Sequence, residues 1–246
     1  MTGADTSTEV RAADLALLGL LQLADTSFPS GAYTLSHGLE TMVADGLVST
    51  ADHVGEVLAV SLLSRFARGD LPALLWAHDA AGRARAGDIG AIEDLLAIDR
   101  RLRAVKLARE EREGSERVGR RIVIEAAALA PSACLTAYDA AIRRGDGPGN
   151  SAVAFGVAAE AFGIGRRQAA LAASMSHATA FAMAALRLGV TGHREAQRVI
   201  RRSIPMIERA VDVAASVAWL DLRPSAPQLD VSSGRHEIAA ARSFAS

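Results

Sequence analysis

The stretch that decides the fold is "AALAASMSHATAFAMAAL", residues 169–186, which contains no Asp, Glu, Lys or Arg over a length close to that of a membrane span. Four polar residues interrupt it, namely Ser174, Ser176, His177 and Thr179, and alanine drives membrane insertion more weakly than leucine or isoleucine. Its small side chains let neighbouring helices approach closely. We therefore predict a buried central helix and keep a membrane span as the less favoured alternative.

Outside this stretch, nearly every apolar segment has the helical period, and no run alternates convincingly as a strand would. The first of them, from about Ala13 to Ala24, is rich in leucine on most faces and is expected to be packed on several sides. Pro205 is expected to kink or split a late helix. The sequence predicts an all-α fold, a single-domain bundle of about ten helices around the Ala-rich helix, spanning residues 13–222 after a flexible N-terminus, residues 1–12.

The C-terminal sequence, "RPSAPQLDVSSGRHEIAAARSFAS", residues 223–246, differs in pattern from the rest. It has two prolines, a serine pair and no sustained apolar stripe. We predict a tail that is ordered mainly by a partner or by a second copy of the chain. Removal of the last dozen residues is then expected to leave the melting temperature of the helical core nearly unchanged.

Composition excludes several classes of protein. Half of the 246 residues are hydrophobic, the formal net charge is −1 and the sequence pI is about 6.6, so the chain can bury a core and has no broad positive field for nucleic acid. The single cysteine, Cys134, lies among apolar residues and is expected to be a packed thiol. No secretory signal precedes the first helical segment, which predicts a cytoplasmic protein.

Motifs for catalysis, metal binding or nucleotide binding are missing from the sequence. No two histidines have the i,i+4 spacing of a helical metal site, and there is no HExxH or GxSxG. The loop "GDGPGN", residues 145–150, lacks the GK[ST] ending of a P-loop and is interpreted as a turn, with Asn150 or Ser151 as the N-cap of the helix that follows. We therefore predict no catalytic, cofactor or metal residue. The six histidines are His37, His53, His78, His177, His193 and His236.

Positive charge is concentrated in one segment, residues 100–122, which holds nine cations and four glutamates. It includes Lys106, the only lysine of an otherwise arginine-based chain. Such a helix could face nucleic acid or an acidic partner. However, glutamates lie at helical-neighbour spacings from arginines, as Glu113 does from Arg117, so the favoured interpretation is a solvated face whose charges pair with one another.

The segment "SFPSGAYTLSHGLET", residues 27–41, contains more special residues than a turn requires. Pro29 and Gly31 are explained by a turn, whereas Tyr33, His37 and Glu40 are not. One hypothesis is a helical enzyme, because His37 and Glu40 are three residues apart and could form an acid–base pair on one face of a helix.

A second hypothesis comes from a resemblance. The segment "LLQLADTSFPSGAYTLSHGLE" resembles the N-terminal signature of the UreF family of urease accessory proteins, and four later blocks resemble family motifs in the same order. The matching residues are Pro29, Gly31, Ala32, Tyr33, Ser36, Gly38, Leu39 and Glu40, then Arg109, Arg112, Ser115 and Gly119, then Phe155, Gly156, Gly163 and Ile164, then Arg187, Leu188, Gly192 and Gln197, and finally Leu229, Asp230, Ser232, Arg235, His236, Glu237, Arg242, Phe244 and Ser246. The chain departs from the pattern at Val190, Thr191, His193 and Ala245, which weakens the inference for the two segments that contain them.

The resemblance implies an all-α, non-enzymatic scaffold for nickel insertion into urease. Members of the family pair with the accessory protein UreD, also called UreH, commonly dimerise, and recruit the GTPase UreG to apo-urease. GTP hydrolysis and nickel delivery then belong to UreG, so nickel is handled by the complex and is not tightly bound by this chain, and neither nucleic acid nor a membrane is a partner. The partner-binding candidates that the matched motifs imply are Pro29, Gly31, Tyr33, Ser36, Glu40, Arg187, Gly192, Gln197, Arg235, His236, Glu237, Arg242 and Phe244.

Overall fold

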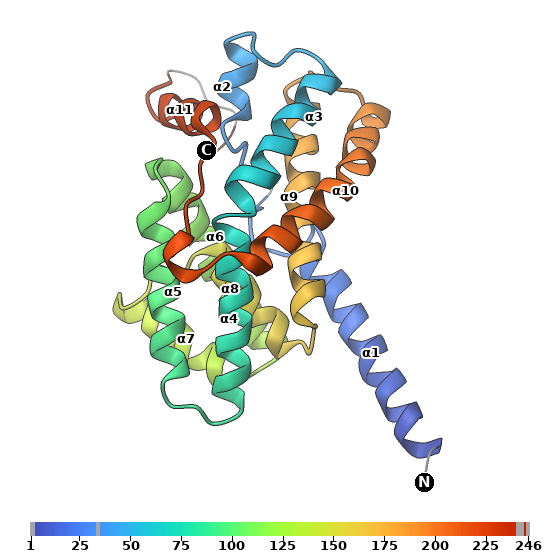
Figure 1. The fold of residues 1–246 in the computed structure, drawn as a ribbon, viewed down its shortest axis with the longest axis vertical. Helices are drawn as coiled ribbons and strands as arrows, with labels where there is room; N and C mark the ends of the chain where they lie inside the picture. Colours follow the sequence, from blue (N-terminus) through green and yellow to red (C-terminus); the bar gives the residue numbers. More distant parts are fainter. Residues whose placement is uncertain (1–2, 33–34, 240–243, 245–246) are drawn as a thin grey trace.

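The fold is all-α, as predicted. The computed structural model describes residues 3–32, 35–239 and 244, with side chains from residue 10 onward, and contains eleven α-helices but no strand in these ranges. Their arrangement is shown in Figure 1. The elements are α1 (Gly3–Ala24), α2 (Leu39–Ala44), α3 (Ala51–Val60), the π-helical turn η2 (Ser61–Phe66), α4 (Asp70–Arg85), α5 (Ala91–Val105), α6 (Arg109–Leu129), α7 (Ala133–Arg144), α8 (Ser151–Ala161), α9 (Arg166–Arg187), α10 (His193–Ser216), the 3-10 turn η3 (Trp219–Asp221) and α11 (Pro227–His236).

Several helix ends follow from local sequence. The hydroxyl of Thr50 accepts a hydrogen bond from the backbone N–H of His53 at 3.2 Å and caps α3. Gly145 ends α7 in the left-handed conformation, with φ of 83°. Pro205 lies inside α10, which continues as one helix, and its two halves run in different directions in Figure 1. A proline removes one backbone hydrogen bond and clashes with the preceding turn, which explains a bend there.

The loop of residues 145–150 is a turn, as predicted, but the side chain of Asn150 does not cap the following helix as expected. Asn150 precedes α8 and makes no side-chain cap. Its Nδ2 instead donates to Oδ1 of the fully buried Asp99 at 2.7 Å, and the hydroxyl of Tyr138 donates to Oδ2 of the same carboxylate at 2.7 Å. Buried polar groups must find such partners, so Asp99 joins α5, α7 and the loop.

The first core cluster is built around α4, α6 and α8. Helix α8 is buried over the whole of residues 152–160 and packs between α4 and α6. Two glycines permit this packing, because a Cβ on Gly156 would lie 2.4 Å from the carbonyl oxygen of Leu74, and one on Gly119 would lie 2.1 Å from that of Gly149. These backbones could not approach as closely with any larger residue.

The second core cluster lies between α2, α3, α9 and α10, and it also receives Leu229 of α11. Helices α9 and α10 contribute to both clusters, so the Ala-rich segment is central, as predicted. Among the described helices, α9 alone is long and apolar enough to cross a membrane, but half of its apolar stretch is buried inside the protein, as is usual for a core helix.

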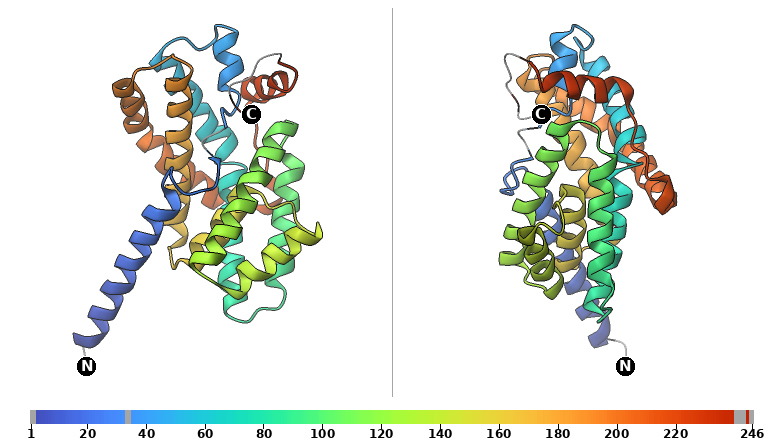
Figure 2. Two further views of the ribbon diagram at one scale, coloured as in Figure 1. Left: turned by 180° about the vertical axis from the view of Figure 1, so that it is seen from behind. Right: turned by 90° about the vertical axis from the view of Figure 1, so that its left-hand side faces the viewer.

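Helix α1 differs from the prediction in both extent and packing. It begins at Gly3, so most of the twelve residues predicted to precede the first helix belong to it. Only its C-terminal end contacts the body, where Leu23 is 4% exposed, whereas Leu18 is 62% exposed. The helix extends away from the body in Figures 1 and 2. The expectation that it is packed on several sides was therefore wrong for this chain taken alone.

The C-terminal segment also differs from the prediction, because it packs on its own chain. The backbone N–H of Arg223 donates to the carbonyl of Arg68 at 3.2 Å, and that of Ser225 to the carbonyl of Ser64 at 3.3 Å. Helix α11 then packs against α2 and α6, with Leu229 buried. The expectation that the segment depends mainly on a partner for its order is corrected by these contacts.

Candidate functional site

The first feature of the site is a buried histidine between two carboxylates. His236, at the end of α11, is 1% exposed; its Nε2 lies 2.9 Å from Oε2 of Glu40 on α2, and its Nδ1 lies 2.7 Å from Oε2 of Glu110 on α6. Each ring nitrogen thus lies within hydrogen-bonding distance of one carboxylate, so the ring joins the two glutamates. We call these three residues the Glu–His–Glu cluster. It joins three helices that are far apart in the sequence.

Glu237, the next residue, holds the start of α6. Its Oε1 accepts hydrogen bonds from the backbone N–H groups of Arg109 at 2.6 Å and Glu110 at 3.2 Å. The first N–H groups of a helix have no partner within the helix, and its N-terminal end carries partial positive charge. The Glu237 carboxylate therefore caps α6 from another part of the chain.

Phe244 and Arg187 complete this side of the site. The backbone N–H of Phe244 donates to Oε2 of Glu40 at 3.2 Å, and the guanidinium carbon of Arg187 lies 4.4 Å from the centre of the Phe244 ring. The second contact is a cation–π interaction. Gly38 allows α11 to approach, because it has φ of 86° and a Cβ there would lie 2.9 Å from Oγ of Ser233.

The structure thus brings together five of the thirteen predicted partner-binding residues, namely Glu40, Arg187, His236, Glu237 and Phe244. Six of the others lie elsewhere: Pro29 is exposed, Gly31 has φ of 77°, Ser36 is buried, Gly192 is the N-cap of α10, Gln197 is exposed on α10, and Arg235 forms an ion pair with Asp45. The remaining two, Tyr33 and Arg242, lie outside the described residues. The five clustered residues hold the C-terminal segment on its own chain, so the structure gives them a role in packing.

The acid–base pair of the enzyme hypothesis does not form on a helix. Helix α2 begins at Leu39, and His37 precedes it with φ of 54°, a left-handed conformation that is uncommon for any residue other than glycine. The carboxylate of Glu40 bonds instead to His236. The shared helical face on which that hypothesis depended is therefore absent from this region.

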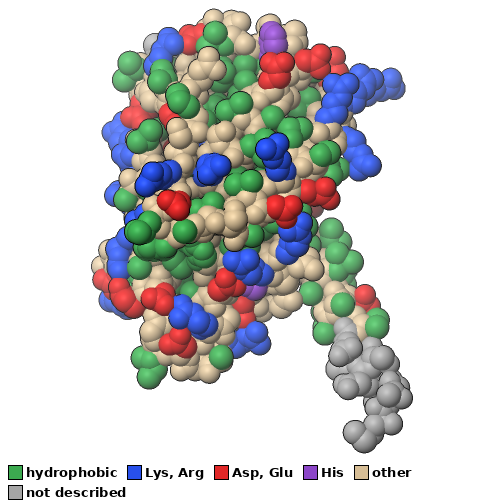
Figure 3. All heavy atoms as spheres, viewed as in Figure 1, with side chains coloured by type: hydrophobic (Ala, Val, Ile, Leu, Met, Phe, Trp, Pro, Cys, Tyr) green, Lys and Arg blue, Asp and Glu red, His purple; other side chains and the backbone are tan. Residues whose placement is uncertain are grey.

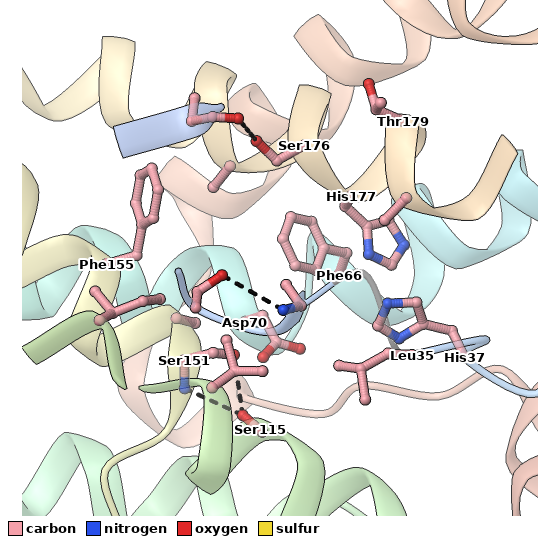
Figure 4. A pocket seen from close by; sticks show the side chains of 18 of the residues that line it. Leu35, His37, Phe66, Asp70, Ser115, Ser151, Phe155, Ser176, His177 and Thr179 are labelled. Atoms are coloured by element: carbon pink, nitrogen blue, oxygen red, sulfur yellow. Dashed lines mark hydrogen bonds between the residues drawn. The ribbon is translucent and has the colours of Figure 1, made fainter. Parts of the chain in front are cut away.

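A cavity of about 480 Å³ lies beneath the connection between α1 and α2. Most of its lining is apolar, and Figure 4 shows His37 and His177 beside one another at one end of it. Their ring centres are 4.8 Å apart, and Nε2 of His177 lies 2.9 Å from Oγ of Ser61. Burial, followed by the nearby Arg65, lowers the pKa of His37 to about 4. Burial, followed by His37, lowers the pKa of His177 well below its usual value, so both rings are neutral at pH 7.

Paired charges border the same cavity. Nζ of Lys106 lies 2.7 Å from Oδ1 of Asp70 and 3.5 Å from Oε1 of Glu111, and Glu111 also pairs with Arg65. Burial alone would raise the pKa of Glu111, but Arg65 and then Lys106 outweigh it and lower that pKa to about 2. Each charge has a partner of opposite sign, as burial requires.

The segment of residues 100–122 pairs only part of its charge internally. Arg103 and Arg120 both pair with Glu116, as the favoured interpretation predicted, but no ion pair joins Glu113 to Arg117 among the described residues. Other charges of the segment pair outside it: Lys106 with Asp70, Glu111 with Arg65, Arg100 with Glu93 and Arg109 with Glu237. Sequence reasoning missed that its Lys106 and Glu111 turn inward to the cavity. Two signals pointed there: Lys106 is the only lysine of the chain, and His177 is a polar residue within an otherwise apolar central helix.

Two further predictions concern chemistry. Among the described residues, no group of three or more His, Cys, Asp or Glu side chains is placed to hold a metal ion. Cys134 is buried, and burial followed by Glu160 raises the pKa of its thiol to about 11, so it is a packed thiol.

One departure from the family motif coincides with a buried hydroxyl group that is unsatisfied within the described part of the chain. At Thr191, where the chain departs from the family pattern, the side-chain Oγ1 is buried with no hydrogen-bond partner among the described residues. An unsatisfied buried hydroxyl is unfavourable, so this residue does not stabilise the turn between α9 and α10.

Comparison with known proteins identifies relatives of the whole chain. The family model named UreF matches residues 48–204. The "Urease accessory protein UreF" of Paenarthrobacter aurescens (strain TC1) is 31% identical over 229 residues, which cover 93% of this chain and 97% of the relative. The protein of the same name from Lachnoclostridium phytofermentans is 29% identical over 230 residues, covering 94% of this chain and 98% of the relative. The one from Trichodesmium erythraeum is 29% identical over 228 residues, covering 93% and 96%.

Proposed function

The chain belongs to the UreF family of urease accessory proteins, and from this premise we propose that it is a non-enzymatic scaffold for urease maturation. Together with a UreD (UreH) protein it recruits the GTPase UreG to apo-urease, where nickel is inserted. Nickel passes between the proteins of that complex, and this chain does not hold it as a cofactor. The observation that carries the proposal is similarity to a urease accessory protein along 93% of the chain, because it covers nearly all of the helices described above.

The arrangement of the candidate residues supports a scaffold. Glu40, His236 and Phe244 fix the start of α2 and the C-terminal segment next to one another, although they lie about 200 positions apart. Glu40 of α2 and the C-terminal residues His236 and Phe244 therefore share one side of the molecule. We propose that this side binds the UreD and UreG partners, with Tyr33 and Arg242, which the family resemblance implicates, as contacts.

Helix α1 supports a homodimer within the complex. Leucines at positions 15, 17, 18 and 21 are all more than half exposed on it. Contiguous exposed apolar surface of this kind is unfavourable in water and is typical of an interface. We propose that a second copy of the chain covers it. We also expect the complex to act in the cytoplasm, with neither a membrane nor nucleic acid as partner.

A complementation experiment tests the proposed function. The gene would be expressed in cells that carry urease and its other accessory genes but lack their own UreF gene, and urease activity and bound nickel would be measured. We expect both to be restored, and tagged protein to capture UreD and UreG. Absence of both restored activity and capture, with the protein soluble and helical, would contradict the proposal. Purified protein is expected neither to hydrolyse GTP nor to bind one nickel ion with submicromolar affinity.

A further inference from the structure

The first two turns of α10 carry an exposed row of arginines that the proposed function leaves without a role. Arg194, Arg198 and Arg201 have the i, i+4, i+7 spacing that places them on one side of a helix. All three are exposed, and Lys and Arg side chains project in Figure 3 at the edge where this half of α10 lies. No hydrogen bond or ion pair engages their guanidinium groups within the part of the chain that the structure describes. We call them the α10 arginine row.

The α10 arginine row works against the stability of its own helix. Arg194 lies in the first turn, where the partial positive charge of the helix end makes a cation unfavourable, and the like charges of Arg194 and Arg198, four residues apart, repel one another. The nearest acidic residue, Glu195, accepts a hydrogen bond from the backbone N–H of Gly192 at 2.9 Å, and the adjacent Arg202 is already paired with Asp52. These unfavourable charges have no compensating contact within the described part of the chain, which indicates that they bind another molecule.

The geometry of the row fits carboxylates. A guanidinium pairs with a carboxylate through two parallel hydrogen bonds, and seven residues of helix span about 10 Å. That length matches three acidic side chains placed one turn apart on another helix. The apolar face of the same turns, formed by Ala196, Val199 and Ile200, is buried, so the row is held on a fixed element.

The surroundings do not fit an extended polyanion. Helix α3 packs beside α10 and exposes Asp52 and Glu56, which would repel phosphates that followed the surface beyond the row. The chain as a whole has a net charge of −1. A short positive row flanked by carboxylates complements a protein surface of mixed charge.

We propose that the α10 arginine row docks a carboxylate-rich helix of a partner protein. The partner would be one member of the maturation complex, so in that respect the inference rests on the proposed function. The row lies beside Gln197, which the family resemblance already implicates in partner binding. The row adds three positively charged contacts, which require carboxylates on the opposing surface.

The test uses the full chain and a synthetic alanine-based helical peptide that repeats glutamate at the i, i+4, i+7 spacing. The same peptide with glutamine, single-stranded DNA and phosphatidylglycerol vesicles are the comparison ligands. The variant Arg194→Glu/Arg198→Glu/Arg201→Glu removes the row. The control Arg117→Glu/Arg121→Glu/Arg223→Glu makes the same change of charge at exposed arginines elsewhere.

We expect the glutamate peptide to bind the wild type and the control, and to bind the row variant at least about tenfold more weakly, since three ion pairs are lost. Binding should weaken as salt is added. Equal binding by the row variant, or a loss confined to DNA or vesicles, would overturn the inference. A second arm measures capture of UreD, UreG and apo-urease. If the wild type captures none of them, the proposed function fails, while the peptide result still decides whether the row binds carboxylates.

A neutral variant distinguishes loss of peptide binding from loss of folding. Because Arg194 opposes the helix dipole and repels Arg198, the neutral variant Arg194→Gln/Arg198→Gln/Arg201→Gln should melt at or above the wild-type temperature and still lose peptide binding. A neutral variant that melts lower and binds the peptide as tightly as the wild type would count against the inference on both readouts.

Discussion

At the two ends of the chain, burial is the reverse of what composition would suggest. Helix α1 is rich in leucine and extends from the body with most of its leucines exposed, whereas the polar C-terminal segment is packed on its own chain with His236 fully buried. Apolar composition therefore predicts that a surface will be covered, but it does not predict whether the same chain or another chain covers it. A polar segment can be held as firmly when its charges meet partners of opposite sign.

The inner part of the N-terminal region differs from the C-terminal segment in how it is held. Leu23, Phe28 and Leu35 line a largely apolar cavity, in which the neutral His37 lies against His177. The C-terminal segment is held by the hydrogen bonds of the Glu–His–Glu cluster and by the ion pair between Arg235 and Asp45. Acid, truncation and charge substitution should therefore affect the two ends differently.

The largest effect is expected for His236→Ala. The substitution removes the shared hydrogen-bond partner of the partly buried Glu40 and Glu110, and loss of such a partner costs about 1–3 kcal/mol for each buried group, or more for a charged one. Urea unfolding would measure it, with His193→Ala at an exposed site as the control. Adding Glu110→Gln to His236→Ala should recover part of the loss. Wild-type stability for His236→Ala would show that the C-terminal segment is dispensable to the chain, as the sequence first suggested.

The second effect is a loss of stability in acid that depends on His37. The pKa of His37 is about 4 in the folded chain and 6.5 in the unfolded one. Between these values the unfolded state binds a proton that the folded state does not, so the free energy of unfolding falls as pH decreases from 6.5 to 4, by up to about 3 kcal/mol. His37→Asn, which tolerates the left-handed backbone, should reduce the difference in unfolding free energy between pH 7 and pH 5. An unchanged difference would contradict the assignment.

A smaller effect is expected for Glu237→Ala, which removes the cap of α6. Loss of a helix cap costs about 1 kcal/mol. Hydrogen exchange should become faster at the backbone N–H groups of Arg109 and Glu110, because they donate their hydrogen bonds to the Glu237 carboxylate. Glu208→Ala, at an exposed position on α10, provides the comparison. Exchange that is equally fast in the wild type would show that the contact does not protect these groups in solution.

The smallest effect on the stability of the single chain is expected for Leu18→Glu on α1. Leu18 is 62% exposed, and substitutions at such sites usually change the free energy of unfolding by less than about 0.5 kcal/mol. Light scattering should nevertheless show fewer dimers, because α1 is the proposed interface between copies. Leu23→Glu, at a position 4% exposed, should unfold the chain instead. Equal destabilisation by both variants would mean that α1 packs along its whole length.

Much of the fold could be predicted because its signals are local. The hydroxyl of Thr50 reaches an N–H three residues away, and the small residues of 169–186 mark a helix that others can approach closely. The extent of α1 could not be predicted in the same way, since leucines on most faces are compatible with burial by the same chain or by another. Asn150 precedes its helix as expected, but Asp99, 51 residues away, takes its side chain.

The motif resemblance named five of the residues that meet in the candidate site, but it did not indicate that Glu40, His236 and Phe244 touch. Sequence reasoning assigned no role to His177 or Lys106, and the cavity that they share lies between α9 and the start of α6. A buried cluster made from separate helices leaves no periodic pattern in any one of them.

The sequence by itself determined the all-α class, the central position of α9 and the family, because helical period, capping and motif order are written within short stretches of chain. The tertiary structure decided that α1 is exposed, that the C-terminal segment is packed on its own chain and that His37 faces His177. The physical reason is distance along the chain: the contact between Glu40 and His236 joins residues 196 positions apart. Such a contact forms only after packing has brought the helices together, so no local pattern specifies it.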